Sequence, residues 1–324
     1  MKELVSIASD YHPSMQLQQL RYFAAVADLR HFTRAAEALH VAQPSLSQQI
    51  RALERELGAD LFYRARGNIT LTDAGAALLP LARQILADAE TARREVQEVA
   101  QLRRGRVRLG APPSLCASLV PDVLRRFHDE FPGVDLLVDE DGSQDLVRTL
   151  GAGELDLALI ISPQPSQGPA LATTELLHEE LVVVSSPSSL PPAGARPRIR
   201  VADLRGKPLA MFRRGYDLRE FTMAACRAAG FEPTLTVEGG EMDAVLGFVR
   251  AGLGIAVVPG MVAARSGLRV TPFAGATMTR TVAVAHRKDV APPRAARELR
   301  RVLLEYLRTA DLGDAAMLAG DRAR

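Results

Sequence analysis

The spacing of apolar residues changes twice along the 324-residue chain. Between residues 15 and 57, apolar positions recur every three or four residues, as expected for amphipathic helices. Residues 73–104 keep a helical spacing over a much longer stretch, and from residue 105 onward short apolar runs alternate with helical segments. The sequence therefore predicts a helical N-terminal part, one long helix and an α/β C-terminal part.

The stretch from Phe32 to Leu57 predicts two short helices joined by a turn at Val41 and Ala42. Pro44 fits the first turn of the second helix, where its missing amide proton is not needed. An inward apolar stripe is then formed at spacings of four, three and four by Leu46, Ile50, Leu53 and Leu57. The Ser, Gln and Arg side chains between them are types that hydrogen-bond base edges and phosphates. A solvated helical hairpin would show the same pattern, so these residues alone leave both interpretations open.

A small wing follows in the stretch LFYRARGNITLTDAG. Two short extended segments, Leu61 to Arg64 and Ile69 to Leu71, flank a predicted turn at Gly67 and Asn68. Arg64 and Arg66 are suited to the phosphate backbone or the minor groove, and simple solvation is the alternative.

Residues 73–104 predict a single helix that begins after Thr72, a good helix-capping residue. Apolar or small residues recur along it at alternating spacings of four and three, which is the heptad spacing of paired helices. The pattern predicts a dimerisation seam, and packing of the helix on its own domain is the alternative. The seam would consist of Leu78, Ala82, Ile85, Ala89, Ala92, Val96 and Val99.

The sequence of the C-terminal part, residues 105–310, predicts a domain of two lobes. Proline and glycine interrupt the chain after the third predicted strand, near Pro163, and a second crossing is predicted between Gly267 and Pro272. We therefore expect lobe I to contain residues 106–162 and 268–310, and lobe II to contain residues 163–267. Residues 1–14 and 311–324 show no persuasive pattern and are expected to be a disordered extension and a tail.

Composition restricts the class of protein. Apolar residues make up 47% of the chain and charged residues 24%, and no apolar run is long enough to predict a membrane span. We expect a cytoplasmic location, since the first residues do not resemble a secretory signal. The net charge is only +2, so any DNA affinity must come from a few placed arginines and helix termini.

An enzyme is not predicted. The sequence contains no GxSxG, P-loop, GxGxxG or HExxH motif, and its six histidines are scattered. Cys116 and Cys226 are too far apart in sequence to suggest a disulfide framework, and two cysteines alone do not make a metal site. We expect no catalytic residue, no cofactor and no metal. A periplasmic solute receptor would have two similar lobes but would not need residues 15–104.

Taken together, LQQLRYFAAVAD, FTRAAEALHVAQPSLSQQIRALERELGADLF, LTDAG, GELDLALI and AGLGIAVVP resemble the LysR-type transcriptional regulators. The resemblance implies a winged helix-turn-helix at residues 15–72, a linker and dimerisation helix at 73–104, and an effector domain like the type II periplasmic binding proteins. The implied partners are a double-stranded DNA operator, a small-molecule effector, a second copy in a homodimer, further copies in a homotetramer, and RNA polymerase. The implied DNA contacts are Thr33, Arg34, Gln43, Pro44, Ser45, Ser47, Gln48, Arg51, Arg64 and Arg66.

The effector site is expected beyond the carboxyl ends of the strands, where ligands of open parallel sheets bind. Its candidate residues are Pro112, Ser114, Ser143, Gln144, Ile161, Phe212, Arg213, Tyr216, Gly239 and Glu241. Helix-start amides and the Ser114 hydroxyl would favour an anion. The acidic run from Asp139 to Gly142 would favour a cation if it faced the site, so the sequence leaves the charge of the effector open.

Overall fold

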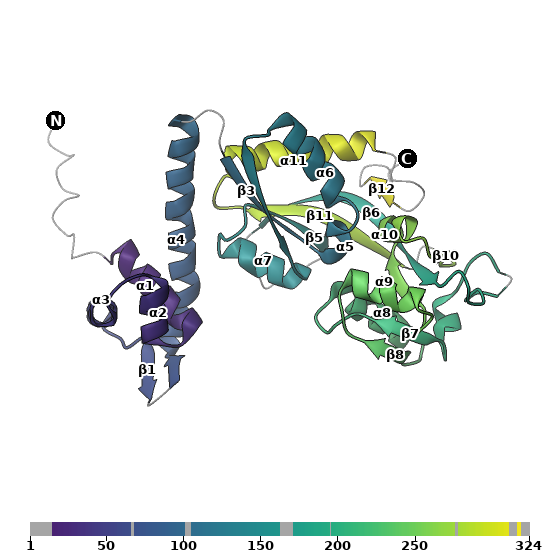
Figure 1. Cartoon of the computed structure of the whole chain (residues 1–324), viewed down its shortest axis with the longest axis horizontal. Helices are drawn as coiled ribbons and strands as arrows, with labels where there is room; N and C mark the ends of the chain where they lie inside the picture. Colours follow the sequence, from purple (N-terminus) through teal and green to yellow (C-terminus); the bar gives the residue numbers. More distant parts are fainter. Residues whose placement is uncertain are drawn as a thin grey trace. The chain divides into compact units, whose positions relative to one another are not determined.

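A computed structural model describes residues 15–65, 68–100, 105–162, 171–194, 196–275, 278–310 and 316–318. The chain divides into two compact units, Met1–Arg94 and Glu95–Arg324 (Figure 1). Among the described residues, no helix is long and apolar enough to cross a membrane.

The first unit is a winged helix-turn-helix. Its elements are α1 (Leu17–Leu29), α2 (Phe32–Ala38), α3 (Gln43–Leu57), β1 (Phe62–Ala65), β2 (Asn68–Leu71) and most of α4 (Asp73–Ala100), whose last residues, from Glu95, count toward the second unit. One apolar core holds α1 to α3, the wing and the start of α4 together, with Phe23, Leu46 and Ile50 fully buried in it. The helical pair predicted between Phe32 and Leu57 is therefore confirmed. Leu57 is an exception within the predicted stripe, because its position at the helix end leaves it 42% exposed.

The wing pairs β1 with β2 in antiparallel fashion, and Ala65 lies opposite Asn68. Asn68 thus belongs to a strand, and its prediction as a turn residue was wrong because the strand begins one residue earlier. Thr72 caps α4 as predicted, since its Oγ1 accepts a hydrogen bond from the Gly75 amide at 3.0 Å. A Cβ atom at Gly75 would lie 2.2 Å from the Leu61 carbonyl oxygen, so the close approach of α4 to the wing requires glycine.

The predicted seam on α4 is wrong at its first two positions. Ala82 is fully buried in the core of its own unit, and Leu78 packs against the same core. Leu81, one residue before Ala82, is 56% exposed instead, whereas the predicted positions Ile85 (37% exposed) and Val96 (70%) are on the surface. The heptad pattern did not distinguish the buried face of α4 from its exposed face, because Ala82 and Leu81 are neighbours in the same turn and only Ala82 is buried.

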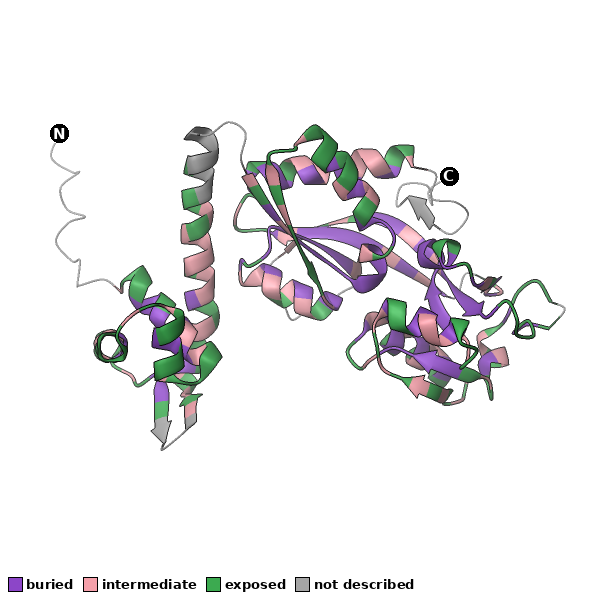
Figure 2. Ribbon diagram, viewed as in Figure 1, coloured by how far each residue is buried: buried purple, intermediate pink, exposed green. Residues whose placement is uncertain are grey.

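Lobe I of the second unit is a sheet covered on both faces. Its strands follow the order β6-β11-β5-β3-β4, and β4 lies at an edge. Helices α6 and α11 share one apolar cluster, whereas α7 packs on another (Figures 1 and 2). The elements are β3 (Gly105–Ala111), α5 (Pro113–Cys116), α6 (Val120–Glu130), β4 (Val134–Glu140), α7 (Ser143–Gly151), β5 (Leu157–Ser162), β6 (Leu171–Ser185), β11 (Thr279–Arg287) and α11 (Arg294–Thr309).

Lobe II has its own apolar core, which includes Phe212, Val245 and Val258. Strand β7 pairs with β8. It is also joined to Ile255, just before the next strand, because the Ala210 amide donates to the Ile255 carbonyl and the Ile255 amide donates to the Pro208 carbonyl, both at 2.9 Å. The elements are η1 (Val201–Leu204), β7 (Pro208–Met211), α8 (Asp217–Ala228), β8 (Thr234–Glu238), α9 (Met242–Arg250), β9 (Ala256–Pro259), α10 (Gly260–Arg265) and β10 (Arg269–Pro272).

Both lobe boundaries differ from the prediction. Strand β6 runs through both lobes: its first part pairs with β11, and its last residues pair with β9 and β10. Residues 171–180 therefore belong to lobe I, and β10 belongs to lobe II. The polar first part of β6 hid a strand from the sequence reasoning, since it does not alternate regularly. Residues Ala316–Leu318 form β12 on β6, within a tail for which no structure was predicted.

Candidate nucleic-acid interface and interlobe site

The outer face of α3 is polar and exposed. Gln43, Pro44, Ser45, Gln48 and Arg51 are all exposed, and Ser47 is half-buried beside them. The apolar stripe of the same helix faces inward, and Leu46, Ile50 and Leu53 are fully buried. The predicted side chains are thus together on one surface at the N-terminal half of the helix.

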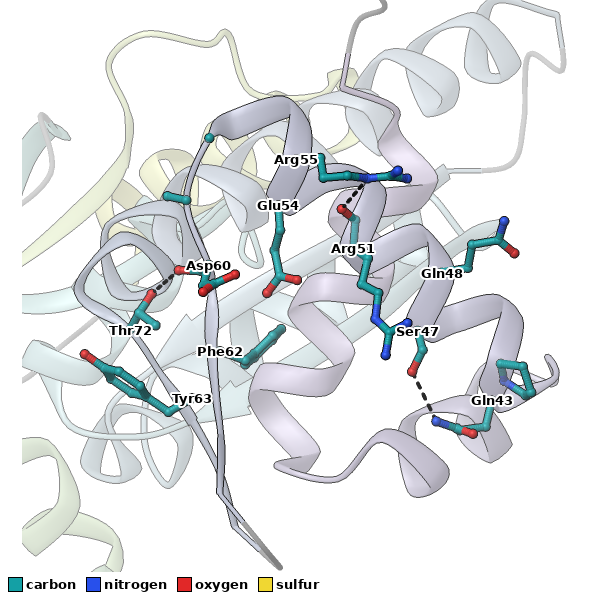
Figure 3. A pocket seen from close by; sticks show the side chains of 13 residues that line it. Gln43, Ser47, Gln48, Arg51, Glu54, Arg55, Asp60, Phe62, Tyr63 and Thr72 are labelled. Atoms are coloured by element: carbon teal, nitrogen blue, oxygen red, sulfur yellow. Dashed lines mark hydrogen bonds between the residues drawn. The ribbon is translucent and has the colours of Figure 1, made fainter.

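A groove of about 1300 Å³ runs between α3 and the wing. In Figure 3, Gln43, Ser47 and Arg51 line it from the helix, and Asp60, Tyr63 and Thr72 line it from the wing side. Within it, the Gln43 amide nitrogen donates to Ser47 Oγ at 3.1 Å. The groove offers hydrogen-bond donors and acceptors of the kind that read base edges.

The base of this groove is held by structural contacts. Glu54 is buried, and its carboxylate accepts a hydrogen bond from the Leu61 amide at 3.1 Å, which ties α3 to the start of the wing. Thr72 Oγ1 donates to the Asp60 carbonyl at 2.6 Å. Arg55 Nε donates to the Arg51 carbonyl at 3.3 Å, so its side chain lies along the outer surface of the helix.

The other predicted DNA contacts are more scattered. Thr33 and Arg34 are exposed on α2. Arg64 lies in β1, and Arg66 falls outside the described residues. Sequence reasoning missed Tyr63, which is 59% exposed on β1 and lines the groove. Strand alternation could have found it, because its neighbour Phe62 is buried in the core.

In the second unit, Ser114 is fully buried and bonded to an arginine that the sequence did not single out. Its Oγ accepts a hydrogen bond from Arg280 Nη1 at 2.9 Å. Arg280 also forms a buried ion pair with Glu179, with Nη2 to Oε2 at 2.7 Å. The second Glu179 oxygen accepts the Met261 amide at 2.9 Å. Ser114 is therefore part of a buried network around β6, and its hydroxyl is not exposed to solvent.

The start of α7 is occupied by a carboxylate from lobe II. Asp217 Oδ2 accepts hydrogen bonds from Ser143 Oγ at 2.5 Å and from the Ser143 amide at 3.3 Å. Ser143 Oγ in turn accepts the Ile161 amide at 3.0 Å. The structure brings these two predicted residues together, while Gln144 points to solvent as an exposed residue.

Arg213 bridges the lobes. Its Nη2 donates to Asp141 Oδ1 at 3.2 Å, and its Nε bonds to Glu241. Glu140, the neighbour of Asp141 in the chain, has a pKa raised by partial burial and then by repulsion from Glu241 and Asp243. The end of β4 thus faces the start of α9 with carboxylates on both sides.

Tyr216 and Phe212 stack with ring centroids 4.6 Å apart, and both are buried. By distance and angle the Tyr216 hydroxyl has no hydrogen-bond partner, although Ser114 is near enough to lower its pKa. Burial has the larger effect and raises that pKa. Of the remaining predicted residues, Pro112 is buried before α5, and the Gly239 amide donates to the Met211 carbonyl at 3.0 Å. Within the described ranges, no group of three His, Cys, Asp or Glu residues is arranged to hold a metal ion.

Two sequence models match the chain. The LysR substrate binding domain matches residues 100–308, and the bacterial regulatory helix-turn-helix protein, lysR family, matches residues 17–76. The transcriptional dual regulator GltC of Bacillus subtilis is 32% identical over 278 residues, which cover 85% of this chain and 92% of GltC. The HTH-type transcriptional regulator IlvR of Caulobacter vibrioides is 34% identical, with 86% of this chain and 94% of IlvR covered.

Solved structures agree with these matches. A full-length OxyR variant from Pseudomonas aeruginosa superposes with a TM-score of 0.68 at 29% identity, covering 94% of this chain and 99% of OxyR. Full-length CbnR in complex with its target DNA superposes with a TM-score of 0.63 at 27% identity, covering 91% of this chain and 99% of CbnR. With a winged helix-turn-helix, a two-lobed α/β domain and these relatives, the chain belongs to the LysR family of DNA-binding transcriptional regulators.

Proposed function

We propose that α3 is the recognition helix of this regulator and that Gln43, Ser45, Ser47, Gln48 and Arg51 contact operator DNA. The observation that carries the proposal is the exposed polar face at the N-terminal half of α3, directly beside the wing groove. That end of the second helix enters the major groove in helix-turn-helix proteins. The complex of CbnR with its target DNA, at 27% identity, supports the same use of this unit.

We propose that α4 pairs with the same helix of a second copy. Leu81, Ile85 and Val96 are large apolar side chains exposed on this helix, and Ala92 is exposed between them. Their spacing suits a seam between two helices. Pairing would present two recognition helices to one operator. The doubled set of DNA contacts would compensate for the low net charge of the chain. Further association into a tetramer and contact with RNA polymerase remain proposals that rest on family membership.

We propose that a small molecule bound between the two lobes regulates DNA binding. Substrate-binding domains of this family carry that role. Ser143 and Asp217 already link the lobes, and so do Asp141 and Arg213. A ligand that favours one placement of the lobes would shift the population of DNA-binding states, with a useful coupling of about 1 to 3 kcal/mol.

Thiol oxidation is the second candidate input, because the hydrogen peroxide-inducible genes activator of Dickeya chrysanthemi is 29% identical over 84% of this chain. The two thiols here do not favour it. Burial raises the pKa of Cys116 to about 12 and that of Cys226 to about 11, which disfavours the reactive thiolate. The two residues also lie in the apolar clusters of different lobes. A bound small molecule is therefore the better proposal.

The proposal is tested by selecting bound fragments from a random DNA pool with the full-length chain. We expect enrichment of a two-fold symmetric motif, because a paired regulator reads two half-sites. The absence of any enriched sequence would contradict sequence-specific DNA binding. Because an operator lies in the cytoplasm, we expect the protein there.

A further inference from the structure

The groups that were expected to hold an anion between the lobes are already satisfied within the chain. The Ser114 hydroxyl is bonded to Arg280, and Arg280 is paired with Glu179. The amide and hydroxyl at the start of α7 are bonded to the Asp217 carboxylate. The guanidinium of Arg213 contacts Asp141 and Glu241. An anionic ligand would have to displace a carboxylate from Arg280, from the start of α7 or from Arg213.

Carboxylates outnumber cations at this place. Asp141 of lobe I and Glu241 of lobe II contact the Arg213 guanidinium. Three further carboxylates lie in the same region: Glu140 of lobe I is repelled by Glu241 and by Asp243, and Asp217 is bonded to Ser143. The nearby Arg214 lies 3.6 Å from Glu238 and is 87% exposed, so it contributes little. The local excess of negative charge attracts a cation and repels an anion.

Two polar atoms in the same region are buried and lack hydrogen-bond partners. They are the hydroxyl oxygen of Tyr216 and Oε2 of Glu241. Tyr216 as a whole is only 2% exposed. The positive charge of Arg280 and the negative charges of Glu241 and Asp217 all act on this hydroxyl, so it lies near these carboxylates and near Arg280. A buried polar group without a partner costs about 1 to 3 kcal/mol. Glu140 and Asp243 are exposed at the rim, so the cluster can be reached from solvent.

We infer that the interlobe site takes a small organic cation, an amine or a guanidine. Its N–H groups donate to Glu140 of lobe I and to the unpartnered oxygen of Glu241 in lobe II, and Tyr216 contacts it. The inference rests on the proposed function in one respect, that the regulatory ligand binds between the lobes. A metal ion fits less well, because no described group of three ligating residues is arranged to hold one.

A cation at this position would also explain how the ligand acts on the lobes. Glu140 is repelled by Glu241 and Asp243, so the two lobes oppose each other at this contact. A bound cation replaces that repulsion with attraction to both sides. It therefore binds more tightly when the lobes are close, and this difference in affinity shifts the population toward the closed placement.

The test uses the full-length protein and three four-carbon probes that differ in charge. Thermal unfolding is followed during titration with putrescine, 1,4-butanediol or succinate at matched ionic strength, and agmatine serves as the guanidine probe. We expect putrescine or agmatine to raise the unfolding temperature saturably, and the diol and succinate to have no saturable effect. Glu140→Gln and Glu241→Gln should each weaken the effective cation about tenfold or more. Asp129→Asn, an exposed carboxylate on α6, is the matched control and should bind as the wild type does.

Saturable binding of succinate, no saturable binding of either cation, or equal cation binding by Glu140→Gln would each overturn the inference. If circular dichroism shows that Glu241→Gln does not fold, the cation affinity of Glu140→Gln alone tests the inference. Operator binding is measured on the same preparations. A protein that binds its operator but neither cation refutes only the cationic ligand, whereas a protein that binds no operator refutes the proposed function.

Discussion

The outer face of α3 and the interlobe site are both rich in polar side chains, but they use them differently. On α3, Gln48 and Arg51 point to solvent, and the described contacts of this face are local, such as Gln43 with Ser47. At the interlobe site, Ser143 of lobe I contacts Asp217 of lobe II, 74 residues away, and within lobe I Ser114 contacts Arg280, 166 residues away. The exposed side chains of α3 are available to bind DNA without any rearrangement of the fold. The side chains of the interlobe site are already bonded to one another, so a ligand there has to rearrange them.

The difference has a consequence for mutations. Removing one side chain from the exposed face leaves no buried group behind, so folding should tolerate it. Removing one member of the interlobe network leaves a buried partner unpaired, which costs free energy of unfolding.

The largest effect is expected for Arg280→Met. The substitution leaves Glu179 buried without its ion-pair partner, and breaking a buried pair in this way costs about 3 to 5 kcal/mol. Urea unfolding of the full-length protein measures it. The matched control is Arg265→Met, which removes an exposed pair with Asp122 and should cost less than about 1 kcal/mol. Similar losses for the two variants would argue against a structural role of the buried network.

A second change extends the contrast to α4. Replacing Leu81 and Ile85 together by aspartate should weaken the proposed helix pairing by about 3 kcal/mol, because each buried apolar side chain contributes about 1.5 kcal/mol or more. Sedimentation velocity should then show monomers at concentrations at which the wild type is paired. Ala82→Asp is the comparison, since this buried residue supports its own unit, and its replacement should lower the unfolding midpoint. Intact oligomers in the double variant would exclude this seam.

The packing of α4 against the wing should be more sensitive to substitution than the exposed face of α3. Gly75→Ala should cost about 1 to 3 kcal/mol, because the new Cβ would lie 2.2 Å from the Leu61 carbonyl oxygen, which belongs to the backbone. Gly247→Ala in α9 is the control: no atom lies within 4 Å of its Cβ position, so alanine should stabilise that helix by about 0.5 to 1 kcal/mol. Equal shifts in the unfolding midpoint would contradict the close approach.

The smallest effect concerns pH. The pKa of Glu140 is raised in the folded protein, so the folded state binds this proton more tightly than the unfolded state does. Its contribution to stability therefore falls as the pH rises through the range above the ordinary glutamate pKa. Glu140→Gln should be slightly more stable than the wild type at about pH 7, and the difference should shrink toward about pH 5. A difference that grows on acidification would contradict the repulsion across the lobes.

Sequence reasoning succeeded where structure depends on neighbours in the chain. The stripe of Leu46, Ile50 and Leu53, the cap at Thr72 and the polar face of α3 follow from periodicity and helix ends, and all are present in the structure. It failed where distant segments decide the outcome. Whether Leu78 or Leu81 is exposed depends on how α4 packs against its unit, and the roles of Glu179 and Arg280 depend on pairing across 101 residues. The lobe boundaries failed for the same reason, because β6 serves both lobes.

The central claim is that side chains on the exposed face of α3 read the operator. Fluorescence anisotropy with the selected operator and its single-base variants tests it on the wild type and on Gln48→Ala, at one fixed salt concentration. We expect the variant to lose about 1 to 3 kcal/mol of discrimination at one base position in each half-site, with an unchanged unfolding midpoint. An unchanged order of preference among the operator variants would contradict the account.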